Sequence, residues 1–416
     1  MFKEWTIQDE KKSGMDDSGV NGTTSAKDLT GSCEKCQSVE RRYEDISCAP
    51  NLFVIHTERP YICAGKRSGH LREKKKVIDR IGKVVSALRN SGGGHLLVHI
   101  DGQESEDRCL EQFDEAITKS LTDLIEDGQL YVNIYKRQWL SELPLSDFQN
   151  DTEFIWLNVE SAHGVATVDF NTKIRDDIAN ENPPYVTVAC LLSTTKARRS
   201  QSAEGQSTQT DTVGSGSTEH IATLLENPQQ YHENRNIEYK ALKSQILKKI
   251  GKSDSGFADY IWTDLKLKYN VTSMSKVENG GSFYVGIAEV QKKYTAQYGT
   301  KVPHIEGFQL TVDPQVVTKL LLQKLKDTVT VLKDGTFHDA PDDLIEITFH
   351  KIPSGYVLEV AVRYCEGLVF YDKEGPRAYE VKGNEIRRID KEVWLRRFSL
   401  SMNNKTLCFK CKEREY

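Results

Sequence analysis

Two glutamates stand five positions apart in the segment HENRNIEYKAL, residues 232–242: they are Glu233 and Glu238. A third acidic residue, Glu289, ends the segment GGSFYVGIAE, residues 280–289. Three carboxylates in one site repel one another unless a cation neutralises them. Mg²⁺ and Mn²⁺ prefer such hard oxygen ligands. The sequence therefore predicts a divalent-metal site formed by Glu233, Glu238 and Glu289.

Phosphodiester cleavage is the chemistry that such a site supports. A metal held by carboxylates lowers the pKa of a bound water and screens the phosphate oxygens. Lys240 follows Glu238 by two residues, so both side chains lie on one face if this segment is a strand. Lys240 could then stabilise the transition-state anion or orient the attacking water. The alternative is that these glutamates only form surface ion pairs with neighbouring lysines and arginines, which contribute little.

The elements around these residues are predicted from hydrophobic periodicity, which indicates helices and strands in both halves of the chain. Helices are expected over residues 74–94, 107–127, 256–269 and 314–325. Strands are expected over residues 95–101, 153–160, 185–192, 236–242, 279–289, 343–352 and 356–364. This mixture predicts an α+β fold.

Two low-complexity stretches divide the 416 residues. We expect a disordered N-terminal tail over 1–48, a first lobe over 49–192, a flexible linker over 193–220, a second lobe over 221–400 and a C-terminal tail over 401–416. The segments GGHLLVHI, residues 93–100, and GGSFYVGI, residues 280–287, share two glycines, a valine and an isoleucine in register. Together with the matching order of elements, they suggest that the two lobes arose by duplication.

These motifs resemble the core domain of the Schlafen family. The likeness lies in Glu-x(4)-Glu-aromatic-Lys at residues 233–240, followed by a Gly-Gly pair that leads into an apolar strand. It extends over about residues 50–400 and implies two pseudo-duplicated lobes forming a U-shaped, positively lined cradle. Members with an intact site cut tRNA and rRNA in a metal-dependent way, so the resemblance implies catalytic roles for Glu233, Glu238, Glu289 and Lys240 in the second, AlbA-type lobe. The first lobe has no matching glutamate pair and is expected to bind RNA.

The chain departs from the family pattern at two places. Glu289 stands where the family usually has aspartate, and the extra methylene can alter metal geometry. Of the family's structural zinc ligands, only His338 and Cys365 have counterparts, because Ala340 and Glu366 replace the others. Two protein ligands do not make a closed zinc site, so no structural zinc is expected there.

RNA would be held by basic side chains that neutralise phosphates. The net charge of −5 gives no overall attraction for nucleic acid, so binding needs a local basic surface. Any single basic residue can equally be a solvated surface charge. The candidates are Arg67, Arg72, Lys74, Lys75, Lys76, Lys248, Lys249, Lys252, Arg387, Arg388, Arg396 and Arg397.

Two Cys-x-x-Cys pairs, Cys33–Cys36 and Cys408–Cys411, could supply a four-thiolate zinc site if the ends of the chain meet. Both pairs lie in segments expected to be mobile. His95 and His99 are four apart on a predicted strand and therefore face the same way. Hydrogen-bonded core histidines are the simpler explanation for them.

The expected function is that of a Mg²⁺- or Mn²⁺-dependent endoribonuclease acting on tRNA or rRNA-like structured RNA. A homo- or hetero-oligomer with another Schlafen-like protein is a further expectation. A non-catalytic nucleic-acid-binding or regulatory subunit, paired with an active Schlafen-like homologue, is the first alternative. A nucleotide-binding regulator is the second, although the sequence has no Walker motif. The charged start MFKEWTIQDEKK and the lack of long apolar runs predict a cytoplasmic protein without a membrane partner, and a nuclear location is also compatible.

Overall fold

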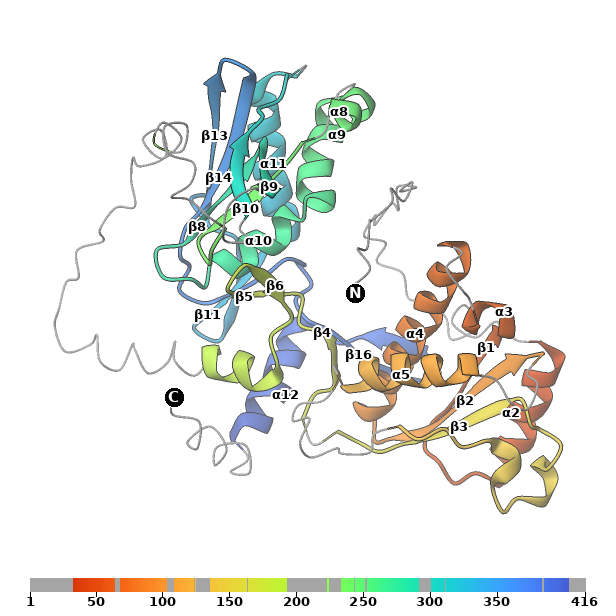
Figure 1. The fold of residues 1–416 in the computed structure, drawn as a ribbon. Coiled ribbons are helices and arrows are strands. Elements are labelled where there is room, and N and C mark those ends of the chain that lie inside the picture. Colours follow the sequence, from red (N-terminus) through yellow and green to blue (C-terminus); the bar gives the residue numbers. More distant parts are fainter. Residues whose placement is uncertain are drawn as a thin grey trace.

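The computed structural model describes residues 33–63, 68–102, 108–122, 124, 135–162, 164–192, 223, 233–242, 244–250, 253–291, 301–310, 312–383 and 385–403. Helices and sheets occur in both halves of this part of the chain, which confirms the α+β fold (Figure 1). None of the described helices is long and apolar enough to span a bilayer.

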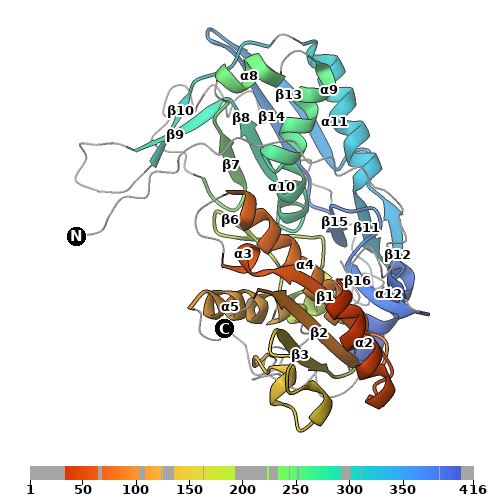
Figure 2. The same cartoon turned by 90° about the vertical axis from the view of Figure 1, so that its right-hand side faces the viewer.

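The first sheet has the strand order β1-β2-β3, formed by Leu52–Glu58, Gly94–Asp101 and Phe154–Val159. β1 and β2 are parallel, and β3 is antiparallel to β2. Helices α4 (Ser68–Arg89) and α5 (Arg108–Thr122) pack against one face, where they share a core with alternate strand residues such as Ile55 and Val98. Helix α2 (Glu34–Ile46) packs against the other face, which carries Val54 and Leu97 (Figure 2).

The large sheet has the order β13-β14-β8-β7, formed by Ile345–Ile352, Gly355–Val362, Gly281–Val285 and Ile237–Lys240. β7 is parallel to β8, whereas β8 and β13 are each antiparallel to β14. Its main core is shared with α9 (Asp254–Asp259), the π-helical η4 (Tyr260–Asp264), α10 (Leu267–Met274) and α11 (Pro314–Thr328).

The remaining elements are α3 (Arg59–Ile62), η1 (Leu140–Glu142), η2 (Ser146–Phe148), β4 (Thr167–Asp169), β5 (Ile174–Asp176), β6 (Ala179–Glu181), α8 (Ser244–Ile250), β9 (Ile287–Gln291), β10 (Lys301–Ile305), β11 (Thr330–Lys333), β12 (Thr336–Asp339), β15 (Leu368–Phe370), β16 (Arg377–Lys382), β17 (Glu385–Arg388) and α12 (Lys391–Asn403).

Elements of the two predicted lobes pack against each other across the predicted boundary. β16 pairs with β4, and Ile386 of β17 lies in the core of the first sheet. Trp394 of α12 packs in the same cluster as Val165, and its indole donates to Thr167. The end of the expected second lobe is therefore part of the structure around the first.

Two segments differ from the structure predicted for them. Residues 185–192 were expected to be a strand but form a helix, which follows Pro184 and buries Tyr185 and Val188, three positions apart, on one side. Residues 34–46 were expected within a mobile tail but form α2, because Cys36, Val39 and Tyr43 give the helix an apolar side that the first sheet buries. Residues 1–32, most of the expected linker and residues 404–416 lie outside the described residues.

In both sheets, an asparagine just before one strand hydrogen-bonds to the Gly-Gly turn that precedes the next strand of that sheet along the chain. Asn51 donates through Nδ2 to the carbonyls of Ser91 and Gly93, at 3.2 and 2.9 Å. Asn236 donates in the same way to the carbonyls of Glu278 and Gly280, at 3.2 and 2.5 Å.

The second glycine of each pair is required by a close backbone approach. A Cβ on Gly94 would lie 2.3 Å from the carbonyl oxygen of Asn51, and one on Gly281 would lie 2.7 Å from that of Asn236. The shared glycines seen in the sequence thus have the same structural cause in both sheets. A common origin of the two lobes stays a prediction.

We expect Asn51→Ala and Asn236→Ala each to lower the free energy of unfolding by roughly 1–3 kcal/mol, because each leaves two carbonyls without their side-chain donor. Asn150→Ala is the control, since Asn150 is exposed in a turn and its loss should change stability by less than about 0.5 kcal/mol. Denaturant titration of the three variants measures this. Equal effects at all three positions would show that the asparagine bonds do not stabilise the turns.

Candidate active site

The segment before β7 brings Glu233 back toward the strand. Asn234 and Ile237 exchange two backbone hydrogen bonds of 3.2 Å, and the side chain of Asn234 accepts from the Asn236 N–H. This tight turn places a carboxylate oxygen of Glu233 2.8 Å from the N–H of Tyr239, which donates to it. Glu233 therefore lies beside β7.

The three glutamates lie within one electrostatic neighbourhood. Burial raises the pKa of Glu233, and the charges of Glu238 and Glu289 raise it further. The hydrogen bond from Tyr239 and the charge of Lys240 act in the opposite direction. Glu289 arrives on β9, which leaves the end of β8 after Gly286, where a Cβ would lie 3.0 Å from the Phe308 ring.

Glu238 is engaged by two cations. Its side chain is only 9% exposed, and one carboxylate oxygen lies 2.7 Å from an Nη atom of Arg175, which is fully buried. The other oxygen forms an ion pair with Lys240, as expected for two side chains on one face of a strand.

Arg175 comes from β5 and was missed from the sequence. It donates to the carbonyls of Asn234 and Ile237 at 3.0 Å and to the side chain of Asn270 on α10, also at 3.0 Å. A buried carboxylate needs such a partner, because an uncompensated charge in the protein interior is costly. No local pattern marks this arginine, since its partners lie far along the chain.

The carboxylates are not arranged as a ready single-ion site. Among the residues that the structure describes, two groups have ligand atoms close enough for one ion, and neither contains Glu233, Glu238 or Glu289. Both groups lie at the first sheet instead. His338 and Cys365 belong to neither of them, and His338 makes a hydrogen bond with Thr336.

The predicted RNA-binding residues differ in their exposure and in whether they form ion pairs within the chain. Arg67 and Lys252 lie outside the described residues, as do the side chains of Lys248 and Lys249. Arg72, Lys75 and Arg396 are exposed, whereas Lys74 is half-buried and burial lowers its pKa. The other four are held in ion pairs within the chain: Lys76 with Glu73, Arg387 with Glu385, Arg388 with Glu374 and Asp372, and Arg397 with Glu380.

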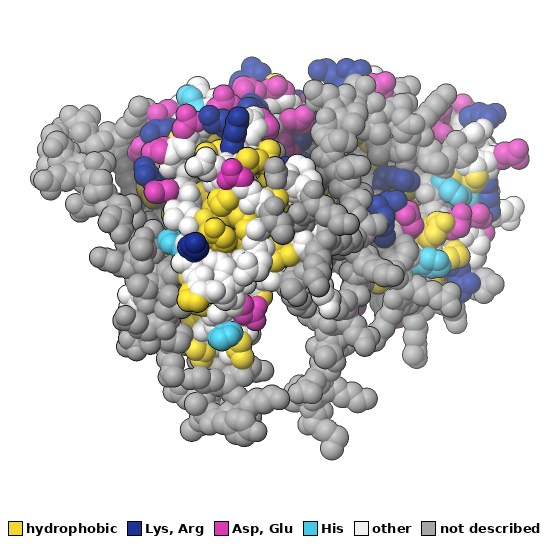
Figure 3. All heavy atoms as spheres, turned by 90° about the horizontal axis from the view of Figure 1, so that it is seen from above, with side chains coloured by type: hydrophobic (Ala, Val, Ile, Leu, Met, Phe, Trp, Pro, Cys, Tyr) yellow, Lys and Arg dark blue, Asp and Glu magenta, His cyan; other side chains and the backbone are white. Residues whose placement is uncertain are grey.

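The face of the molecule in Figure 3 shows lysine and arginine side chains mixed with aspartates and glutamates. The described residues in that view therefore do not form one continuous basic surface. The free cations Arg72 and Lys75 on α4 are the clearest candidates for phosphate contacts among the residues described.

No family model matches the chain, and no curated protein matches it. Among solved structures, similarity is found to the N-terminal domain of an ATP-dependent DNA helicase RecG-related protein from Nitrosomonas europaea. The identity is 16%, covering 34% of this chain and 72% of that chain, with a TM-score of 0.22. The DIP2311 protein from Corynebacterium diphtheriae is also similar, with 16% identity, 43% of this chain and 28% of that chain covered, and a TM-score of 0.22. Scores this low carry no argument about fold or function.

We expect Arg175→Met to lower the free energy of unfolding by about 3–5 kcal/mol, because it leaves Glu238 buried without its main partner. Adding Glu238→Gln should recover part of the loss, since the unpaired charge is then removed. Arg363→Met is the matched control: its ion pair with Asp343 is exposed, and its loss should cost less than about 1 kcal/mol. Denaturant titration of the single and double variants decides, and a double variant no more stable than Arg175→Met would argue against the charge explanation.

Proposed function

We propose that this chain is a Schlafen-type, divalent-metal-dependent endonuclease that acts on structured RNA such as tRNA. Glu233, Glu238 and Glu289 form its acidic site, with Lys240 beside them. The observation that carries the proposal is the fold-back of Glu233 onto β7, the strand of Glu238, where its carboxylate accepts from the Tyr239 N–H at 2.8 Å. The charges of Glu238 and of Glu289, which comes from a distant segment, also raise the pKa of Glu233. The sequence resemblance at residues 233–240 and 280–289 supports the same assignment.

The donor chemistry fits Mg²⁺ or Mn²⁺, because three carboxylates offer hard oxygen ligands. The geometry fits only in part, since Lys240 and Arg175 hold both oxygens of Glu238. Binding of one ion by all three glutamates therefore requires Lys240 to release Glu238. Lys240 is half-buried on a flexible side chain, whereas Arg175 is fixed by four partners.

This difference gives the chain's own residues distinct roles. Arg175 positions Glu238 and compensates its charge inside the protein. Lys240, once released, is placed to neutralise charge that develops on a phosphate oxygen. A bound divalent cation would supply the activated water that breaks the phosphodiester bond.

The second candidate is a non-catalytic nucleic-acid-binding or regulatory subunit with a Schlafen-like fold. The observation that favours it is that Glu238 already forms ion pairs with Arg175 and Lys240. These two cations compensate the carboxylate charge that a metal ion would otherwise compensate. In that case, the acidic group is a structural ion-pair network, and cleavage would need an active partner.

Incubation of the purified chain with labelled tRNA and Mn²⁺ should give cleavage products that disappear when EDTA is added. Glu233→Gln and Glu289→Gln should each reduce the cleavage rate roughly 100-fold or more, because each removes a charge that the transition state needs. Glu278→Gln is the matched control, since Glu278 is exposed two residues before the Gly-Gly pair and its change should leave the rate unchanged. Binding of tRNA without cleavage, equal in all four proteins, would establish the second candidate instead.

RNA affinity should depend on free cations rather than on ion-paired ones. We expect Arg72→Ala to weaken tRNA binding and to reduce the slope of log Kd against log salt by about 1, the effect of one lost phosphate contact. Arg388→Ala should change the slope little, because its guanidinium is already held by Glu374 and Asp372. Fluorescence anisotropy titrations at several salt concentrations measure both, and the reverse order would show that RNA displaces the ion pairs.

A further inference from the structure

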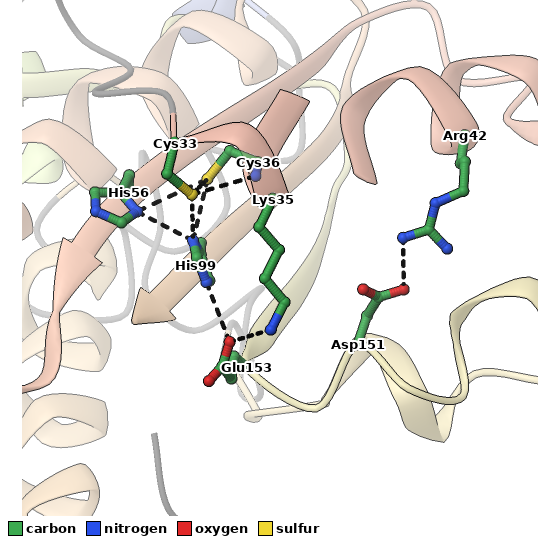
Figure 4. Close-up of polar contacts among 8 residues, drawn as sticks. All are labelled: Cys33, Lys35, Cys36, Arg42, His56, His99, Asp151 and Glu153. Carbon is green, nitrogen blue, oxygen red and sulfur yellow. Dashed lines mark hydrogen bonds and ion pairs between the residues drawn. The ribbon is translucent and has the colours of Figure 1, made fainter. Parts of the chain in front are cut away.

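The strongest unexplained cluster of side chains lies on the first sheet, away from the acidic residues. Cys33, Cys36, His56 and His99 place two thiol sulfurs and two imidazole nitrogens within 4.8 Å of one another (Figure 4). We propose that these four residues bind a structural zinc ion. His99 and Cys36 are each only 1% exposed, whereas Cys33 and His56 are half-buried, so the cluster lies at the edge of the core.

The pairing of β1 with β2 brings the two histidines together. His56 and His99 are register partners on parallel strands, so their side chains leave the sheet on the same face at the same level. Their Nδ1 atoms are 3.0 Å apart. The sequence spacing alone gave no reason to connect them.

Helix α2 supplies the two cysteines. Cys33 is its N-cap residue, and its sulfur accepts from the N–H of Cys36. Val39 and Tyr43 then fix the rest of the helix against the same face of the sheet. The first turn of the helix therefore presents both sulfurs toward the histidines.

The distances match a tetrahedral zinc site. Zinc–sulfur bonds of about 2.3 Å and zinc–nitrogen bonds of about 2.0–2.1 Å place two sulfurs about 3.8 Å apart, a sulfur and a nitrogen about 3.6 Å, and two nitrogens about 3.3 Å. The two sulfurs are 3.5 Å apart. Cys36 lies 3.1 Å from Nδ1 of His99 and 3.8 Å from Nδ1 of His56, and Cys33 lies 3.4 Å from Nδ1 of His99. Each of these separations, including that between the two histidines, is within about 0.5 Å of the expected value.

A second residue supports the ligand role of His99. With Nδ1 turned to the cluster, Nε2 lies 3.4 Å from a carboxylate oxygen of Glu153, which also forms an ion pair with Lys35. Zinc-bound histidines commonly use their other nitrogen in this way, and the carboxylate fixes the ring and raises its basicity. The other group of ligand atoms, His99 with Asp101 and Glu153, uses the exposed Asp101 and shares this histidine.

This site differs from both zinc arrangements considered from the sequence. It uses Cys33 and Cys36 without Cys408 and Cys411, which lie outside the described residues, and it lies far in sequence from His338 and Cys365. Its effect would be to fasten α2 to the first sheet, closing a face that would otherwise expose Val54 and Leu97.

X-ray absorption spectroscopy of the full-length protein, purified without chelator and supplied with zinc, tests the proposal without any mutation. We expect about one zinc per chain by elemental analysis, with two sulfur and two nitrogen ligands. Four sulfur ligands would show that the terminal cysteine pairs meet, and oxygen ligands without sulfur would place the metal at Asp101 and Glu153. Either result, or failure to bind zinc, overturns the proposal.

Variants give an independent measurement. Glu153→Ala should weaken zinc binding by roughly 10–100-fold in competition with a chromogenic chelator, because the partner of His99 is lost. Glu160→Ala is the control, since this exposed glutamate follows β3 and should leave the affinity unchanged.

Cysteine variants then identify the ligands. Cys36→Ser should reduce the thiolate charge-transfer absorption of the cobalt-substituted protein to about half or less, because only the Cys33 thiolate remains, whereas Cys48→Ser, at an exposed thiol, and the double variant Cys408→Ser, Cys411→Ser should keep it. Loss of the absorption in the double variant alone would contradict the assignment.

Discussion

The acidic site depends on the neutralisation of one buried carboxylate. Glu238 lies on β7 on the same face as Phe283 and therefore beneath the helices of the large sheet, where a lone negative charge is costly. Arg175 supplies the compensating charge and also ties the turn before β7 to α10. The position of Glu233 depends on that turn, so one ion pair sets the geometry of the candidate site. Lys240 is the more exposed of the two cations that contact Glu238.

The two sheets share the asparagine-held Gly-Gly turn but carry different side chains beside it. Asn51 and Asn236 hold equivalent Gly-Gly turns, which aligns Phe53 of β1 with Glu238 of β7. Phe53 packs in an apolar core beneath α4, in the position that Glu238 takes in the large sheet. Its distinctive residues, His56 and His99, lie on the opposite face beneath α2. Similar backbones thus place candidate sites of different chemistry on opposite faces.

Interactions cross the boundary that the sequence predicted between the two lobes. The β5–β6 hairpin, from the expected first lobe, contributes Arg175 and Asn180 to contacts with Asn270 of α10. β16 and β17, from the expected second lobe, lie against α4 and β4. Each predicted lobe therefore contributes elements that pack against the other lobe. The surroundings of Glu238 include Arg175 from the first half of the chain.

The sequence by itself determined the α+β character, the four expected helical segments, six of the seven expected strands and the candidate acids, because these features depend on side-chain periodicity and on neighbours within a few residues. It also indicated the Gly-Gly turns, although not the asparagines that hold them. Local pattern failed at residues 185–192, where an apolar run was compatible with either helix or strand and tertiary packing chose the helix. Only the tertiary structure decided that Arg175 pairs with Glu238, and that strand register and the docking of α2 gather Cys33, Cys36, His56 and His99. Such contacts join distant segments, so their partners are selected by packing and by the need to compensate buried charge, neither of which spacing along the chain encodes.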